Sequence, residues 1–220
     1  FERSNTPDID RAVIRLKYML DNERPVVLKN EKIALMRTIP NPPEIFTKGE
    51  MNTLKEVYRI HERGEVCNIN VDYSLLLDTG FNEKREEIAE SIKRFEKHGD
   101  ASSVHYLKQL LSILDSVEAL AERYRKEAEK VGNKTVAESF SRIPANPPAN
   151  FLQALQMLRL LHFTMWCGNN YHNTLGRFDQ YMYKYFKNDL DRGLLDYESA
   201  LELVEEFFLS LNRDSDLYPG

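Results

Sequence analysis

Residues 168–211 read GNNYHNTLGRFDQYMYKYFKNDLDRGLLDYESALELVEEFFLSL, and this stretch decides how the rest of the chain is interpreted. An apolar segment ends just before it. A polar turn containing Asn169, Asn170, His172 and Asn173 follows, and a new helix is expected to begin at Gly176-Arg177-Phe178-Asp179-Gln180. Polar side chains collected between two well-anchored helices are a common way to build one side of a pocket.

The helices on either side of this turn are predicted from hydrophobic periodicity and capping residues. Residues 150–166 are apolar nearly all round, which is typical of a helix inside a large protein. After the turn, we expect helices over residues 177–192 and 197–212, separated by Gly193 and with Asp196 as the cap of the second.

Further upstream the sequence predicts more helices and two short strands. Pro7 and Asp8 open a helix that ends before Pro25, and Thr47 with Glu50 forms a capping box for a helix running to about Glu62, closed by Gly64. The remaining expected helices are a short one near Asp72, a surface helix over 82–97, a long helix over 101–131 and a short one over 135–143. The expected strands are 26–28 and 33–36, joined by a turn.

Composition limits the possible partners. Hydrophobic residues make up 42% and charged residues 30% of the 220 residues, and the net charge is −5 with no basic tract, so nucleic acid and anionic membranes are poor partners. No apolar run approaches the roughly 18 to 20 residues that span a bilayer. The two cysteines, Cys67 and Cys167, do not suggest a disulfide framework, and a reducing cytoplasm is expected.

Three motifs together carry a resemblance to a known family. They are CNINVDYSLLLDTGF at 67–81, RIPANPPANFLQALQMLRLLHF at 142–163, and GRFDQYMYKYFKNDL followed by LLDYESALELVEEFFLSLN at 176–212. In order and approximate spacing they resemble the glycyl radical enzymes, in the branch of pyruvate formate-lyase-like proteins, glycerol, diol and hydroxyproline dehydratases and choline lyase. The resemblance covers roughly residues 24–220.

This resemblance implies a fold and a domain organisation. The chain itself reads as mostly α. It would be part of a ten-stranded α/β barrel, with residues 1–63 giving N-terminal helices and short strands and residues 64–220 giving helical shell and pocket-lining segments. Because the chain starts with Phe1 and stops at a turn, we expect the N-terminal part of a longer enzyme; a naturally short protein is the alternative.

The resemblance also implies a reaction class. The expected function is that of a lyase or dehydratase acting on a small polar substrate through a cysteine thiyl radical. Formate acetyltransferase activity is the first alternative, and a non-catalytic helical scaffold or split relative is an alternative of another class. The family's Cys-x-Glu and Arg-Val-x-Gly-Tyr-like motifs are absent here, so neither Cys67 nor Cys167 is assigned a catalytic role.

Candidate site residues follow from the resemblance by position. Asn68 occupies the place where relatives often carry a substrate-contacting His, and the 169–174 turn matches the place where they carry a Ser or Thr. The candidate substrate-binding residues are therefore Asn68, Asn70, Asn169, Asn170, His172 and Thr174. The alternative for Asn68 and Asn70 is helix capping, and for the turn it is C-capping by Asn with a surface His.

Other conspicuous residues are given structural roles. The motif residues expected to hold the framework are Asp72, Tyr73, Gly176, Arg177, Asp179 and Gln180. His162 is expected to be a core histidine, and the row Tyr181, Tyr183, Tyr185 and Phe186 to be mainly core packing. The histidines show no metal-binding spacing, so no metal is expected.

The resemblance finally implies partners outside the chain. The glycyl radical would be installed by a partner activating enzyme that uses S-adenosylmethionine and an iron–sulfur cluster, and the chain itself would bind no cofactor. The small-molecule substrate and a second copy in a homodimer complete the expected partners.

Overall fold

The computed structural model describes residues 6–40, 43–57, 69–170 and 173–214, and this part of the chain is mostly helical, as predicted. It contains no β-strand; residues 70 and 174 form an isolated bridge. The helices are α1 (Asp8–Asn22), α2 (Lys48–Glu56), α3 (Tyr73–Lys97), α4 (Ala101–Val131), α5 (Lys134–Arg142), α6 (Phe151–Cys167), α7 (Phe178–Asp191), α8 (Tyr197–Leu211) and the short 3-10 helix η1 (Asn212–Asp214).

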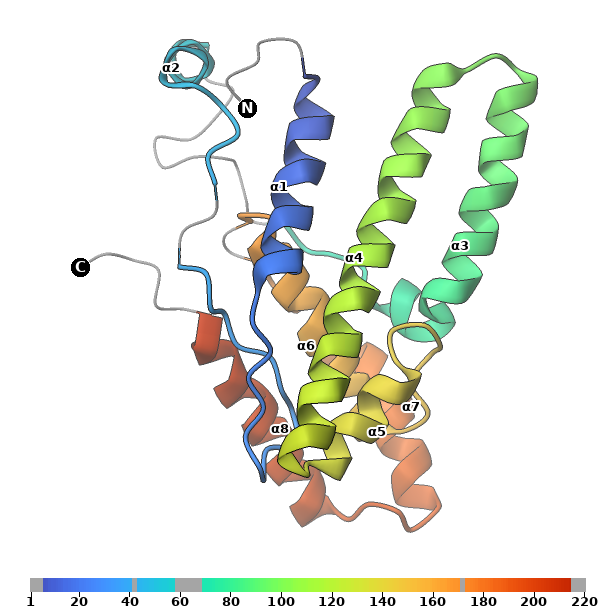
Figure 1. Ribbon diagram of the computed structural model, residues 1–220. Coiled ribbons are helices and arrows are strands. Elements are labelled where there is room, and N and C mark those ends of the chain that lie inside the picture. Colours follow the sequence, from blue (N-terminus) through green and yellow to red (C-terminus); the bar gives the residue numbers. More distant parts are fainter. Residues whose placement is uncertain (1–5, 41–42, 58–68, 171–172, 215–220) are drawn as a thin grey trace.

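The long helices α3 and α4 form an antiparallel hairpin, and α1 packs on α4 beside it (Figure 1). Helix α5 turns back against α4, while α6 contacts α1, α3, α7 and α8. Helix α6 is thus the central element of the described chain. It joins the N-terminal helices to the C-terminal pair.

The apolar helix α6 is buried as its sequence predicts. Asn150 caps it by accepting a hydrogen bond from the backbone N–H of Gln153 at 2.8 Å. The buried residues of α6 are Phe151, Ala154, Leu155, Gln156, Met157, Leu158, Arg159, Leu160, Leu161, His162, Phe163 and Cys167. The three polar members, Gln156, Arg159 and His162, therefore need partners inside the protein.

One of these polar residues forms a buried ion pair. The guanidinium of Arg159 donates to both carboxylate oxygens of Asp214, at 2.6 and 2.8 Å, and to the carbonyl of Leu35 at 3.0 Å. Both side chains are almost fully buried. The pair therefore connects α6, η1 and the extended segment 33–36.

The prediction of two short strands is wrong for this extended segment. Leu35 has a φ of +105°, which a regular strand does not tolerate. The backbone N–H groups of this segment bond to helix side chains and not to a neighbouring strand. The side chain of Gln156 accepts from the Ala34 N–H at 2.8 Å, and the Tyr124 hydroxyl accepts from the Met36 N–H at 3.2 Å. Segment 26–28 is likewise not a strand.

Element α3 consists of two helical pieces, in agreement with the two helices that the sequence predicts. They meet at Gly80, whose φ of +69° and ψ of −175° are not helical. An added Cβ at Gly80 would lie 2.6 Å from the backbone carbon of Asn146. The loop that follows α5, which contains Pro144, Pro147 and Pro148, thus passes so close to Gly80 that only glycine fits there. The carbonyl of Pro144 in this loop accepts a hydrogen bond from the N–H of Phe81 at 2.9 Å.

Helix α2 begins at the predicted capping box, where Thr47 and Glu50 bond to each other's backbone. It ends at Glu56 rather than at about Glu62, and Gly64 lies outside the described residues. Buried Arg11 of α1 donates to Glu50 at 2.9 Å and to the carbonyl of Ile45 at 3.3 Å. These bonds join α2 to α1.

Candidate functional site: the turn after helix α6

The polar turn begins where α6 ends. Asn169 has φ +64°, a left-handed conformation that asparagine adopts more readily than most residues. The carbonyl of Met165 accepts from the backbone N–H and from the side-chain Nδ2 of Asn170, both at 3.2 Å. Buried Arg15 of α1 donates to the carbonyl of Gly168 at 2.9 Å. The start of the turn is therefore held by its own helix and by α1.

The second half of the turn bonds to a segment far away in sequence. The Asn173 amide donates to the Asn170 carbonyl at 2.8 Å, which closes the turn on itself. The backbone N–H of Thr174 then donates to the carbonyl of Ile69 at 3.2 Å, and its hydroxyl donates to Oδ1 of Asn70 at 3.0 Å. Residues 69–73 and 173–176, two of the predicted site segments, thus lie side by side.

Asp72 and Tyr73 hold the first of these segments to the framework. Asp72 caps α3 by accepting from the Ser74 N–H at 3.1 Å. The Tyr73 ring is buried 6.3 Å from that of Tyr181, and burial raises the pKa of its hydroxyl to about 12. This hydroxyl therefore stays protonated near neutral pH, and it has no hydrogen-bond partner among the described residues.

Arg177, Asp179 and Gln180 form a local cluster at the start of α7. The guanidinium of Arg177 donates to the Asp179 carboxylate at 3.1 and 3.2 Å, and the Gln180 amide donates to it at 2.9 Å. These hydrogen bonds lower the pKa of Asp179 to about 2, so the carboxylate is ionised at neutral pH. Arg177 and Asp179 are 74% and 64% exposed. They pair with each other at the surface.

His162 lies beneath the turn and is buried, as expected for a core histidine. Burial, reinforced by the charge of nearby Arg159, lowers its pKa to about 4, so the ring is neutral at pH 7. It packs against Trp166 with 6.4 Å between ring centroids, and the backbone of Asn173 in the turn lies close enough to act on its pKa in the opposite direction. Nδ1 has no partner among the described residues, so the ring is only partly satisfied. Sequence reasoning missed this contact with the turn, because periodicity places His162 only on an apolar helix.

Two of the predicted substrate contacts, Asn68 and His172, lie outside the described residues. The structure brings Asn70 and Thr174 into direct contact, and Asn169 and Asn170 belong to the same turn as Thr174. The described candidates therefore converge on one region. Sequence reasoning did not anticipate the anchoring residue Arg15, because its partner Gly168 is 153 positions away.

The aromatic row on α7 serves packing in part. Tyr181 and Tyr185 are half-buried, and their hydroxyls donate to the carbonyls of Leu175 and Leu77, each at 2.7 Å. Phe186 lies against Phe151 of α6, with ring centroids 5.8 Å apart. Tyr183 departs from the prediction, because it is 56% exposed.

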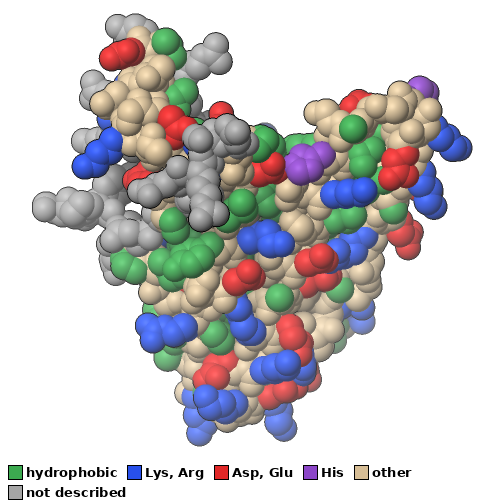
Figure 2. All heavy atoms as spheres, turned by 45° about the horizontal axis from the view of Figure 1, so that its top comes forward, with side chains coloured by type: hydrophobic (Ala, Val, Ile, Leu, Met, Phe, Trp, Pro, Cys, Tyr) green, Lys and Arg blue, Asp and Glu red, His purple; other side chains and the backbone are tan. Residues whose placement is uncertain are grey.

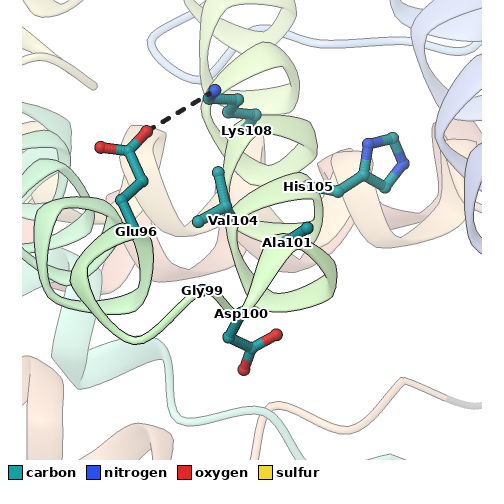
Figure 3. A pocket seen from close by; sticks show the side chains of 7 residues that line it. All are labelled: Glu96, Gly99, Asp100, Ala101, Val104, His105 and Lys108. Carbon is teal, nitrogen blue, oxygen red and sulfur yellow. Dashed lines mark ion pairs between the residues drawn. The ribbon is translucent and has the colours of Figure 1, made fainter.

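An open cleft occurs elsewhere, at the tip of the α3–α4 hairpin (Figure 3). It has an apolar floor at Val104 and Ala101, with Glu96, His105 and Lys108 at its rim. Lys108 pairs with Glu96 across it at 4.0 Å, and His105 contacts Asp10 of α1 at 2.7 Å. None of the predicted site residues lines this cleft, so it does not belong to the candidate site.

The surface supports the charge pattern that the sequence predicts. Figure 2 shows Lys and Arg interspersed with Asp and Glu over the visible face, without a large region of one sign. Across the described ranges, no three His, Cys, Asp or Glu residues gather in a way that could hold a metal ion. Within those same ranges, every helix is too short or too polar to cross a bilayer.

Comparison with known proteins identifies the family. The sequence model of the family described as "Pyruvate formate lyase-like" matches residues 42–218. The chain belongs to this family. A protein of Escherichia coli (strain K12) named a probable dehydratase is 29% identical over 173 residues, which are 70% of this chain and 21% of that protein. The isethionate sulfite-lyase of Bilophila wadsworthia is 26% identical over 163 residues, which are 67% of this chain and 20% of that protein.

Solved structures show the same fold. The glycerol-bound, B12-independent glycerol dehydratase of Clostridium butyricum superposes with a TM-score of 0.74 and 19% identity, over 96% of this chain and 36% of that one. Of the two curated relatives described above, the chain spans about a fifth of the length. It corresponds to a part of these larger enzymes.

Proposed function

We propose that this chain is the N-terminal part of a glycyl radical lyase or dehydratase and that it supplies one wall of the substrate pocket. The observation that carries the proposal is the pairing of residues 69–73 with residues 173–176, in a family whose similar members are named dehydratases and lyases. Motif position alone predicts that both segments belong to the site. The pairing joins them across 104 positions.

The proposed reaction needs groups that lie elsewhere in the full-length enzyme. A cysteine thiyl, formed by the glycyl radical, takes a hydrogen atom from a hydroxyl-bearing carbon of the substrate and becomes a thiol. In a dehydration, the neighbouring hydroxyl takes up a proton and leaves as water, while the first hydroxyl gives up its proton. The resulting product radical takes the hydrogen atom back from the thiol, so the thiyl is regenerated.

The residues of this chain would bind and orient the substrate. The proposed contacts are Asn68, Asn70, Asn169, Asn170, His172 and Thr174. Amide and hydroxyl groups both donate and accept hydrogen bonds, and they suit substrate hydroxyls without changing protonation near pH 7. The Asn and Thr side chains would therefore bind the substrate without transferring protons to or from it.

The rest of the assembly is proposed from the family. The full-length protein would form a ten-stranded α/β barrel around the radical site, with residues 1–63 and 64–220 of this chain lying in its outer shell and pocket wall. A radical S-adenosylmethionine activating enzyme would install the radical, and the lyase would be a homodimer. Water exclusion by the barrel would protect the radical.

The proposal is tested with the full-length protein and its activating enzyme under anaerobic conditions. Electron paramagnetic resonance should show a glycyl radical, and the activated protein should consume a hydroxyl-bearing substrate from a panel of glycerol, 1,2-propanediol and isethionate. Pyruvate with coenzyme A is included, because its turnover would assign formate acetyltransferase activity instead. Failure to form a radical with an activating enzyme that works on a known relative would favour the non-catalytic scaffold.

A variant then tests the pocket wall itself. Asn169→Gly removes the amide while keeping the left-handed backbone conformation. Loss of one substrate hydrogen bond should raise KM about fivefold with the radical signal unchanged. Asn30→Gly, an exposed turn residue outside both segments, is the matched control and should leave KM unchanged.

A further inference from the structure

We propose that Asn70, Thr174 and Gly176 form a lock that fixes the two pocket segments relative to each other, so that Asn70 acts mainly as a positioning residue. This inference rests on the proposed function and deepens it. It assigns a role within the pocket wall that differs from direct substrate contact.

The first part of the lock is a two-point attachment. The backbone N–H of Thr174 donates to the Ile69 carbonyl at 3.2 Å, and the Thr174 hydroxyl donates to Asn70 Oδ1 at 3.0 Å. Residues 70 and 174 form an isolated parallel bridge. A backbone bond together with a side-chain bond determines both the spacing and the register of the segments, which a single bond would leave adjustable.

The second part is a steric restriction at Gly176. This residue has φ +59°, and a Cβ added there would lie 2.4 Å from Asn70 Oδ1 and 3.1 Å from its Cγ. No side chain fits at position 176 while Asn70 keeps its place. Because residue 176 has no side chain, the Asn70 carboxamide can occupy the position in which its oxygen accepts a hydrogen bond from the Thr174 hydroxyl.

The third point is that this contact lies outside the core. Asn70, Thr174 and Gly176 are all exposed in the described chain, so the lock adds little to burial or to global stability. A bond of this kind has its main effect on local geometry. The carboxamide oxygen of Asn70 and the hydroxyl proton of Thr174 are occupied by each other, which leaves the remaining polar residues of the two segments for the substrate.

The lock is tested without relying on turnover by hydrogen exchange of the full-length protein. Thr174→Val should speed exchange in residues 69–73 as well as in 169–176, and Asn70→Leu should do the same in both segments. Thr174→Ser keeps the hydroxyl donor and Asn70→Asp keeps the acceptor oxygen. Hydrogen exchange in both variants should therefore be as slow as in the wild type. Thr53→Val, which removes an exposed hydroxyl bonded within α2, is the control. Faster exchange confined to the mutated segment would overturn the lock.

Kinetics then separate positioning from independent substrate contacts. If the two residues act as a unit, Thr174→Val and Asn70→Leu should each lower kcat/KM about fivefold, and the double variant should lose no more than either single one. Additive losses, about 25-fold in the double variant, would overturn the positioning role. Absence of a radical and of turnover in the wild type would refute the proposed function instead, and the exchange experiment would still decide the lock.

Discussion

The interior around helix α6 and the candidate site next to it satisfy their polar groups in opposite ways. In the interior, the Arg159–Asp214 ion pair is fully buried and its partners belong to this chain. At the site, the Arg177–Asp179 pair and the Asn70–Thr174 contact are exposed. The same chain thus pairs the polar groups of its core away from solvent and those of the candidate site at its surface.

The largest effect is expected from breaking the buried ion pair. Asp214→Ala leaves the guanidinium of Arg159 buried with only the Leu35 carbonyl as a partner, which should cost about 3–5 kcal/mol of stability. Urea unfolding of the full-length protein, followed by its helical signal, measures the loss. The double variant Arg159→Met with Asp214→Leu should recover most of it, because a packed apolar pair replaces the charges. A double variant as unstable as Asp214→Ala would show that the Arg159–Asp214 pair does more than neutralise the two charges.

Gly80 and Gly176, where an added Cβ would lie too close to neighbouring atoms, should lose different amounts of stability when each is replaced by alanine. Gly80→Ala would push a methyl group against the backbone of Asn146 in a positive-φ conformation, at a cost of about 2–4 kcal/mol. Gly176→Ala meets only the movable end of Asn70, so it should cost less stability yet still lower kcat/KM. Thermal unfolding and steady-state kinetics of both variants make the comparison. Equal losses of stability would contradict the division between interior and site.

The buried ring of His162 predicts a pH dependence of the interior. Its pKa is lowered to about 4 from an ordinary value of 6.5, so between these values the unfolded chain binds more protons than the folded one. Stability should be fully present above pH 6.5 and should fall by up to about 3 kcal/mol as the pH drops to 4. His162→Gln, which cannot be protonated, should flatten this part of the profile. An unchanged slope in that variant would assign the dependence to other groups.

The smallest effect is expected at the exposed ion pair. Arg177→Met should leave the unfolding transition unchanged, because an exposed pair in water contributes little. Thermal unfolding of the full-length protein is sufficient to check this. A loss as large as that of Asp214→Ala would show that the remaining polypeptide buries this part of α7.

The sequence predicted those features that depend on neighbouring residues. The capping box at Thr47, the cap at Asp196 and the all-round apolar character of α6 are local signals, and all three are confirmed. The strand prediction for residues 33–36 failed, because the partners of that backbone are side chains on α4 and α6. A short apolar run cannot reveal whether a strand or a helix side chain will bond to its backbone.

The candidate site was predictable only as two separate segments. Motif position placed Asn70 and Thr174 in the site, but nothing in either segment indicated that the two side chains meet. The same holds for Arg159 and Asp214, whose pairing depends on how α8 returns along α6. Contacts over long sequence separations follow from topology, and single-sequence patterns do not contain it.

The extended segment 33–36 has a consequence for the order of folding. Its bonds to Gln156 and Arg159 close loops of 122 and 124 residues, so they cannot form until α6 has been synthesised and has become helical. Closing such loops carries an entropic cost before any contact repays it. Residues 33–36 leave the ribosome well before α6 and are therefore expected to reach their final hydrogen bonds only after α6 has formed, and until then the backbone of Ala34 and Leu35 must be hydrated by solvent.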